Sequence, residues 1–176
     1  MNDNHDKARD TPEDRALDYQ LDFIKLEFGA INEAIARIDQ TTQGTKNWAV
    51  IVWAGSIAIA LGNKDLRSFV ALTSAVPLLF WFIDAQWRRI QRSFIFRSRT
   101  IAAFLNGPDL VESMRQRKVV GLFLLDPRAT REHDSEAYRR FTSFRRTFRF
   151  KEVGPFYFGL VAISVIVAQA LRWYGR

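Results

Sequence analysis

The sequence predicts an all-α membrane protein with three transmembrane helices, long cytoplasmic helical extensions and an N-terminal helix that is amphipathic or forms a coiled coil. The chain of 176 residues has three windows without a charged residue, at 47–63, 68–83 and 153–171. Apolar residues recur with heptad spacing before the first window. Basic residues are concentrated between the last two windows, with 16 Lys and Arg against 7 Asp and Glu in residues 85–152.

The first 46 residues are expected to form a disordered tail over 1–12 and an amphipathic helix over 13–43. Thr11 and Pro12, followed by two acidic residues, are typical of a helix start. Apolar residues then recur at spacings of 4 and 3 for three heptads. We interpret them as an oligomer seam made of Leu17, Leu21, Ile24, Phe28, Ile31, Ile35 and Ile38.

The same seam also suits packing against the chain's own cytoplasmic helices, and three heptads do not decide between these partners. A second apolar strip of Phe23, Leu26 and Ala30 favours a bundle of more than two helices. Isoleucine at most d positions favours the same outcome, so we expect a homo-oligomer larger than a dimer. Gly44 is the expected joint between this helix and the first charge-free window.

The windows 47–63, 68–83 and 153–171 are interpreted as three transmembrane helices. As helices, their 17, 16 and 19 residues extend roughly 26, 24 and 29 Å, against a hydrocarbon core of about 30 Å. A soluble hairpin of buried helices is the alternative. It is disfavoured because each window is apolar on every face, and because tryptophans gather near the window ends as in an interfacial belt.

Small residues recur every fourth position in the first two windows, where they let helix backbones approach closely. This packing surface consists of Ala54, Ala58, Gly62, Ala71 and Ala75. Packing of the two windows within one chain and self-association explain it equally well.

The distribution of basic residues predicts the orientation in the membrane. Residues 1–46 and 85–152 together carry 22 Lys and Arg, whereas the 63–67 turn and the short tail 172–176 together carry 4. The positive-inside rule therefore predicts a cytoplasmic N-terminus and a C-terminus outside.

The segment 84–152 is expected to be a basic cytoplasmic helical domain. Its first helix continues the second window as one helix over 68–105 and stops at Asn106-Gly107-Pro108. Asp109 with Glu112 resembles a capping box. Residues 119–125 are expected to be buried as either a strand or a helix end. Asp126-Pro127 is expected to open another helix, whose apolar face is Ala137, Phe141, Phe144 and Phe148.

Basic and aromatic residues alternate just before the third window. Such a run can bind RNA, but its place beside a membrane span favours anionic lipid headgroups, and nucleic acid is not expected as a partner. The expected headgroup-binding residues are Arg139, Arg140, Arg145, Arg146, Arg149 and Lys151.

The sequence gives little support for catalysis. It has two histidines and no cysteine, lacks nucleophile and phosphate-binding motifs, and predicts no catalytic residue, metal site or cofactor. Asp84 is the one acidic residue at a window boundary, where it is either an ion or proton site or an interfacial partner of Arg88. Trp81 and Trp87, which mark headgroup depth, favour the pair.

A resemblance follows from three short motifs: Asn47-Trp48-Ala49-Val50, then Asp84 with Arg88 and Arg89, then Arg97-x-Arg99. Together they resemble an uncharacterised family of prokaryotic integral-membrane proteins, a domain of unknown function, over residues 31–106 and 139–171. In layout the chain is also similar to the SLATT-like small membrane effectors. The resemblance implies the predicted topology and a bacterial inner-membrane location.

These observations favour a non-enzymatic, self-assembling membrane protein that acts as a channel, a pore or a membrane effector. The alternative is a monomeric membrane anchor or adaptor whose basic cytoplasmic domain binds anionic lipid or an unidentified protein. A membrane enzyme is the least supported class.

Overall fold

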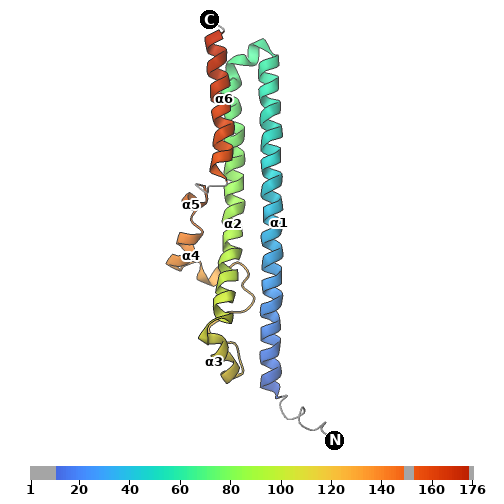
Figure 1. Ribbon diagram of the computed structural model, residues 1–176, viewed down its shortest axis with the longest axis vertical. Coiled ribbons are helices and arrows are strands. Elements are labelled where there is room, and N and C mark those ends of the chain that lie inside the picture. Colours follow the sequence, from blue (N-terminus) through green and yellow to red (C-terminus); the bar gives the residue numbers. More distant parts are fainter. Residues whose placement is uncertain (1–10, 149–152, 175–176) are drawn as a thin grey trace. The chain divides into compact units, whose positions relative to one another are not determined.

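The computed structural model describes residues 11–148 and 153–174, and within them it contains helices and irregular segments but no strand. This confirms the all-helical prediction. Residues 1–10 and 175–176 of the expected tails lie outside the described residues. The elements, shown in Figure 1, are α1 (Pro12–Gly62), η1 (Lys64–Ser74), α2 (Ala75–Leu105), α3 (Pro108–Gln116), η2 (Thr130–Glu132), α4 (Glu136–Phe141), α5 (Phe144–Phe148) and α6 (Gly154–Tyr174).

Helix α1 begins where the sequence predicts, because Thr11 and Asp14 cap each other. The Thr11 hydroxyl accepts a hydrogen bond from the Asp14 N–H at 3.3 Å, and the Asp14 carboxylate accepts one from the Thr11 N–H at 3.3 Å. The helix then runs for 51 residues. The joint expected at Gly44 is wrong, since α1 passes through this residue without interruption.

The chain divides into two compact units. Unit 1 holds the described residues of 1–36 and 92–139, and unit 2 those of 37–91 and 140–176.

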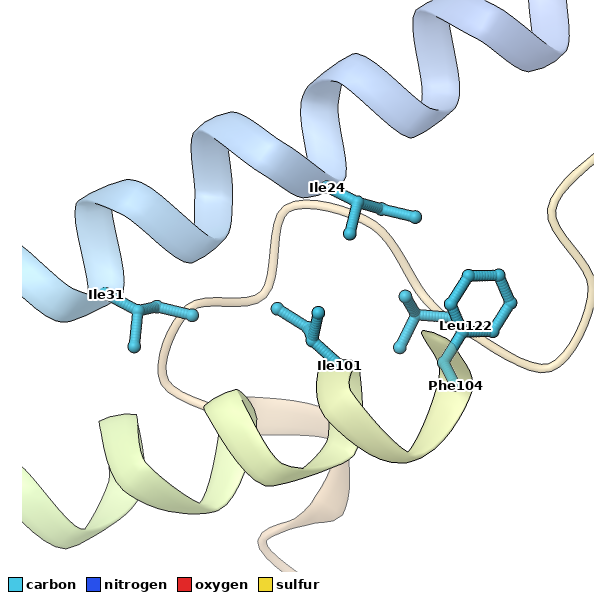
Figure 2. Packing of buried hydrophobic residues seen from close by; sticks show 5 residues of the cluster. All are labelled: Ile24, Ile31, Ile101, Phe104 and Leu122. Carbon is cyan, nitrogen blue, oxygen red and sulfur yellow. The ribbon is translucent and has the colours of Figure 1, made fainter. Parts of the chain in front are cut away.

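The core of unit 1 is apolar and joins α1 to α2. Ile24 and Ile31 of α1 are 2 % and 0 % exposed and pack with Ile101 and Phe104 of α2. Figure 2 shows these side chains pointing toward one another, with Leu122 from the irregular segment beside them. Ile24 and Ile31, two residues of the heptad pattern, are therefore buried by residues of their own chain.

The segment 119–125 is neither the strand nor the helix end that we expected. It is irregular, and side chains from helices bind its backbone instead of a ladder or a helical turn. Gln20 accepts a hydrogen bond from the Val119 N–H at 2.7 Å, and Ser113 accepts one from the Val120 N–H at 2.9 Å. Leu122 alone among the segment's side chains is fully buried.

The helix expected to start at Asp126-Pro127 is also absent. These residues form a turn closed by the Ala129 N–H on the Asp126 carbonyl at 2.9 Å, and Ala129 has a positive φ of 51°. The next α-helix, α4, begins only at Glu136. The apolar face expected over 137–148 is divided between α4 and α5, and its Ala137 is exposed.

The predicted stop after α2 is confirmed. Helix α2 ends at Leu105, and Gly107 is required there because a Cβ would lie 2.7 Å from the Ala103 carbonyl oxygen. Pro108 then opens α3. The capping box expected from Asp109 and Glu112 is wrong, since α3 has no side-chain hydrogen bond at its N-cap.

Two helical stretches within the described residues are long and apolar enough to cross a membrane. They are Lys64–Leu105, which joins η1 to α2, and Gly154–Trp173 in α6. Helix α6 packs against η1, as Figure 1 shows. The expected single α-helix over 68–105 instead begins as a 3-10 helix and becomes α-helical at Ala75.

Unit 2 is held together by a polar contact between its apolar segments. The hydroxyl of Ser164 on α6 accepts a hydrogen bond from Trp53 Nε1 of α1 at 2.8 Å. The Thr73 hydroxyl of η1 donates to the same oxygen at 3.3 Å. Interhelical hydrogen bonds of this kind are typical of packed membrane helices.

Candidate functional site

Asp84, in α2, is a fully buried carboxylate. Its exposed fraction is 0 %, and neither of its oxygens completes a hydrogen bond with any described residue. The hydroxyl of Tyr157 on α6 is also buried and makes no hydrogen bond within the described chain. The two side chains interact electrostatically, so the carboxylate and the hydroxyl lie near each other. Buried polar groups in this state are rare in native proteins and require an explanation.

An apolar cluster adjoins Asp84 along α2. Ala49 of α1 packs with Val153 and Tyr157, and Phe80 and Trp81 cover this cluster one turn before Asp84. Helix α5 is attached to α2 through Trp81. The Trp81 ring stacks on the Phe148 ring with 4.1 Å between their centroids, and Trp81 Nε1 donates a hydrogen bond to the Phe148 carbonyl at 3.2 Å. The apolar side chains of Phe80 and Trp81 thus precede Asp84 by one turn of α2.

Two cations act on Asp84 electrostatically, Lys46 of α1 and Arg88 of α2. The expected hydrogen-bonded pair of Asp84 with Arg88 does not form within the described residues. Arg88 Nη1 instead donates to Asp39 Oδ1 and to Gln91 Oε1, each at 2.9 Å. Arg88 therefore acts on Asp84 through its charge and not through a hydrogen bond.

A second buried charged site lies in unit 1, where Arg97 of α2 pairs with Glu27 of α1. The Arg97 side chain is 1 % exposed and its Nε donates to Glu27 Oε1 at 2.8 Å. Arg97 Nη2 donates to Glu27 Oε2 at 3.1 Å and also to the Phe123 carbonyl. Glu27 accepts two further hydrogen bonds, from the N–H groups of Leu125 at 3.0 Å and Asp126 at 3.1 Å.

Asp126 continues this network and starts η2. Burial alone would raise the pKa of Asp126, but hydrogen bonds from Thr130 and from the Arg131 N–H, together with the charge of Arg97, hold this pKa below its usual value. The Thr130 N–H donates to Asp126 Oδ1 at 2.8 Å. The network fixes the irregular segment on α1 and α2, and we assign it a structural role.

The residues of the predicted oligomer seam differ in their exposure. Leu17, Ile24, Ile31 and Ile38 are buried within the chain, and Leu21 and Ile35 pack against the core of unit 1. Phe28 remains exposed, as does the second strip of Phe23, Leu26 and Ala30. Within the described chain, the second strip is therefore accessible to a partner, whereas the buried residues of the seam are not.

The small residues of the predicted packing surface are not buried inside the chain. Ala54, Ala58, Gly62, Ala71 and Ala75 are all exposed, and a Cβ added at Gly62 would meet nothing within 4 Å. Packing of the first two windows on each other therefore does not account for them.

The predicted headgroup-binding residues are accessible where the structure describes them. Arg139 and Arg140 of α4 and Arg145 and Arg146 of α5 are exposed. Arg149 and Lys151 lie outside the described residues. Of the tryptophans expected in the interfacial belt, Trp48, Trp87 and Trp173 are exposed, whereas Trp53 and Trp81 donate hydrogen bonds inside unit 2.

Within residues 11–148 and 153–174, no three His, Asp or Glu side chains gather closely enough to hold a metal ion. His133 contacts the Tyr138 ring and lies 3.3 Å from the Arg128 carbonyl oxygen.

Sequence reasoning named Asp84 and Arg88, but it missed Tyr157 as a partner of Asp84 and missed Glu27 altogether. It noted Arg97 only as part of a motif. A signal was present, because Arg97 continues the spacing of the apolar residues Ile90, Phe94 and Ile101.

The fold and site thus define an all-helical protein with two helices of membrane-spanning length and a buried carboxylate in one of them. Comparison with protein-family models, curated proteins and solved structures finds no match. The resemblance to an uncharacterised prokaryotic membrane family therefore stays a prediction.

Proposed function

We propose that the protein is a non-enzymatic, multi-pass membrane anchor or adaptor. In this proposal the apolar end of α1, η1 with the first part of α2, and α6 cross the plasma membrane, with the N-terminus in the cytoplasm and the C-terminus outside. Unit 1 is then the cytoplasmic part that binds a partner protein.

The observation that carries the proposal is the exposure of large apolar side chains in all three segments. Ile51 and Ile59 of α1, Leu79 of α2, and Phe158 and Ile166 of α6 are 59–67 % exposed. Soluble monomers rarely expose contiguous apolar surface on this scale, whereas a bilayer covers it.

The adaptor role is supported by the way unit 1 uses its apolar residues. Ile24 and Ile31 are buried in the core of unit 1, so a second copy of the chain is not needed to bury these heptad residues. The segment 85–152 has 16 basic against 7 acidic residues, a balance that suits acidic partners and anionic lipid. On α5, Arg145 and Arg146 are exposed, and Phe148 of the same helix stacks on Trp81, a residue type that prefers headgroup depth.

Single cysteines test the topology on a clean background, since the chain has no native cysteine. A membrane-impermeant maleimide should label Gly175→Cys in intact cells and Ser135→Cys only after lysis. Leu79→Cys, although 60 % exposed in the isolated chain, should stay unlabelled in both because lipid covers it. Ready labelling of Leu79→Cys would refute insertion, and labelling of Gly175→Cys only after lysis would refute the orientation.

Self-assembly, as a channel, a pore or a membrane effector, is a second candidate function. It is favoured by the exposed heptad-like strip of Tyr19, Phe23, Leu26 and Ala30 on α1. Membrane insertion would hold copies parallel and raise their local concentration. A discrete multimer larger than a dimer in native mass spectrometry would support this candidate, whereas a monomer supports the adaptor.

A further inference from the structure

Asp84 combines complete burial with the lack of a hydrogen-bond partner among the described residues. An ionised carboxylate in this state costs several kcal/mol, whereas a neutral carboxylic acid costs far less. Phe80 and Trp81 of an apolar cluster precede it by one turn of α2, and Tyr157 of α6 lies near it. Burial therefore favours the protonated form of Asp84.

Charged and titratable groups face Asp84 from each of the three elements around it. Lys46 comes from α1, Arg88 from α2 itself and Tyr157 from α6. The two cations favour the ionised carboxylate, whereas burial favours the neutral acid, so the two influences act in opposite directions. They also repel a metal cation, which would add a further positive charge to the site. A buried carboxyl group that also interacts with specific charged residues is typical of a functional site.

We propose that Asp84 is a proton-binding site at one end of the apolar bundle of unit 2. The carboxylate takes up one proton to form the neutral acid, whose O–H then donates a hydrogen bond to the unpartnered hydroxyl oxygen of Tyr157. Release of the proton leaves the anion facing Lys46 and Arg88. The site thereby couples the local proton concentration to the packing of α6 against α2. The proposal builds on the proposed membrane protein, but the proton site itself requires only the folded bundle of unit 2.

A hydrophobic carbodiimide tests this site, because it reacts with protonated carboxyl groups in apolar surroundings. The full-length protein in nanodiscs is treated with dicyclohexylcarbodiimide over a pH series, and the labelled residue is located by peptide mass spectrometry. Asp84 should be labelled at low pH and lose labelling as the pH rises, and Asp84→Asn should abolish this signal. Lys46→Gln removes a facing cation and should move the midpoint up by about one pH unit.

Glu27 is the matched control. It is also buried, but its carboxylate accepts hydrogen bonds from Arg97 and from two backbone N–H groups, and it should stay unlabelled. The proposal is overturned if Asp84 is labelled at no pH, or equally at every pH, while the protein stays folded. Protection by sodium or potassium chloride, but not by choline chloride, would also overturn it and indicate a metal-cation site.

The same experiment in detergent micelles separates this proposal from the proposed function. If carbonate extracts the protein from membranes, insertion has failed, yet pH-dependent labelling of Asp84 in the folded, detergent-bound protein would still support the proton site.

Discussion

Replacement of Glu27 by glutamine is expected to destabilise unit 1 by about 3–5 kcal/mol, because it breaks a buried ion pair. Each oxygen of Glu27 accepts two hydrogen bonds, one from Arg97 and one from a backbone N–H of the irregular segment. The amide NH₂ group of glutamine therefore faces two donors in either orientation. Two unsatisfied buried donors cost about 1–3 kcal/mol each, which agrees with the first figure.

The measurement combines denaturant unfolding, followed by circular dichroism, with hydrogen exchange resolved by mass spectrometry. In Glu27→Gln, the amides of Leu125 and Asp126 should lose protection first, since their acceptor is altered. The matched control is Lys25→Gln on the same helix. Its ion pair with Asp22 has a similar N–O distance of 2.9 Å, but both side chains are exposed, so unfolding should not change measurably.

Equal unfolding curves for Glu27→Gln and Lys25→Gln would refute the reasoning, and so would retained protection at Leu125 and Asp126. The double replacement of Glu27 and Arg97 by methionine provides a second check. It removes both charges together and should cost less than Glu27→Gln alone, because no charge remains buried without a partner.

Three further predictions concern the other features. Reversal of Arg145 and Arg146 to Glu should raise hydrogen exchange in α5 in anionic nanodiscs but not in zwitterionic ones, and equal exchange in the two lipids would contradict headgroup binding. The double variant Ile24→Asp with Ile31→Asp should unfold unit 1, which hydrogen exchange would show as lost protection in α1. The double variant Phe23→Asp with Leu26→Asp should keep the fold and dissociate any multimer, as seen by native mass spectrometry. Retained protection in the first variant would show that these isoleucines do not form the core. Because the pKa of Asp126 is lowered in the folded state, its contribution to stability is present at neutral pH and is lost as the pH falls below about 4. Asp126→Asn should therefore show a flatter pH profile of thermal unfolding near that range, and an unchanged profile would refute this contribution.

Local signals in the sequence predicted the start of α1 and the end of α2. Thr11 and Asp14 determine the start of α1, and Asn106-Gly107-Pro108 determines the end of α2. Both features depend on residues within one or two turns of each other, and such short-range chemistry is visible in a sequence. Of the three charge-free windows, 68–83 and 153–171 fall in the two helical stretches of membrane-spanning length, whereas 47–63 lies in α1 and is not one of these stretches.

The segment 119–129 could not be predicted, because its conformation depends on partners far away in the chain. Gln20 and Glu27 are about a hundred positions from the N–H groups that they bind. The Asp126-Pro127 pair has the composition of a helix start, yet Asp126 is already bound to Glu27 through its N–H and the chain turns instead. No local pattern contains this information.

The buried charged residues could be predicted from the sequence only in part. Asp84 lies seven residues from both Pro77 and Gln91, which are buried on the same helix, and Arg97 lies in the apolar spacing of α2. The apolar spacing of the sequence thus marks Arg97 as buried, whereas the burial of Asp84 becomes visible only in the structure. It does not name Tyr157 or Glu27 as their partners, because these lie on other helices and only the tertiary structure brings them near.

In the membrane-inserted state that we propose, the 3-10 conformation of η1 determines the thickness of bilayer that matches the window 68–83. A 3-10 helix rises about 2.0 Å per residue against 1.5 Å in an α-helix, so the window 68–83, with its first part in η1, extends about 27 Å instead of 24 Å. The extra length compensates much of the mismatch with a hydrocarbon core of about 30 Å. Conversion of all 11 residues of η1 to α-helix would shorten the chain there by about 5 Å. In the membrane-inserted state that we propose, thinner bilayers would therefore favour the α-helical form of this segment.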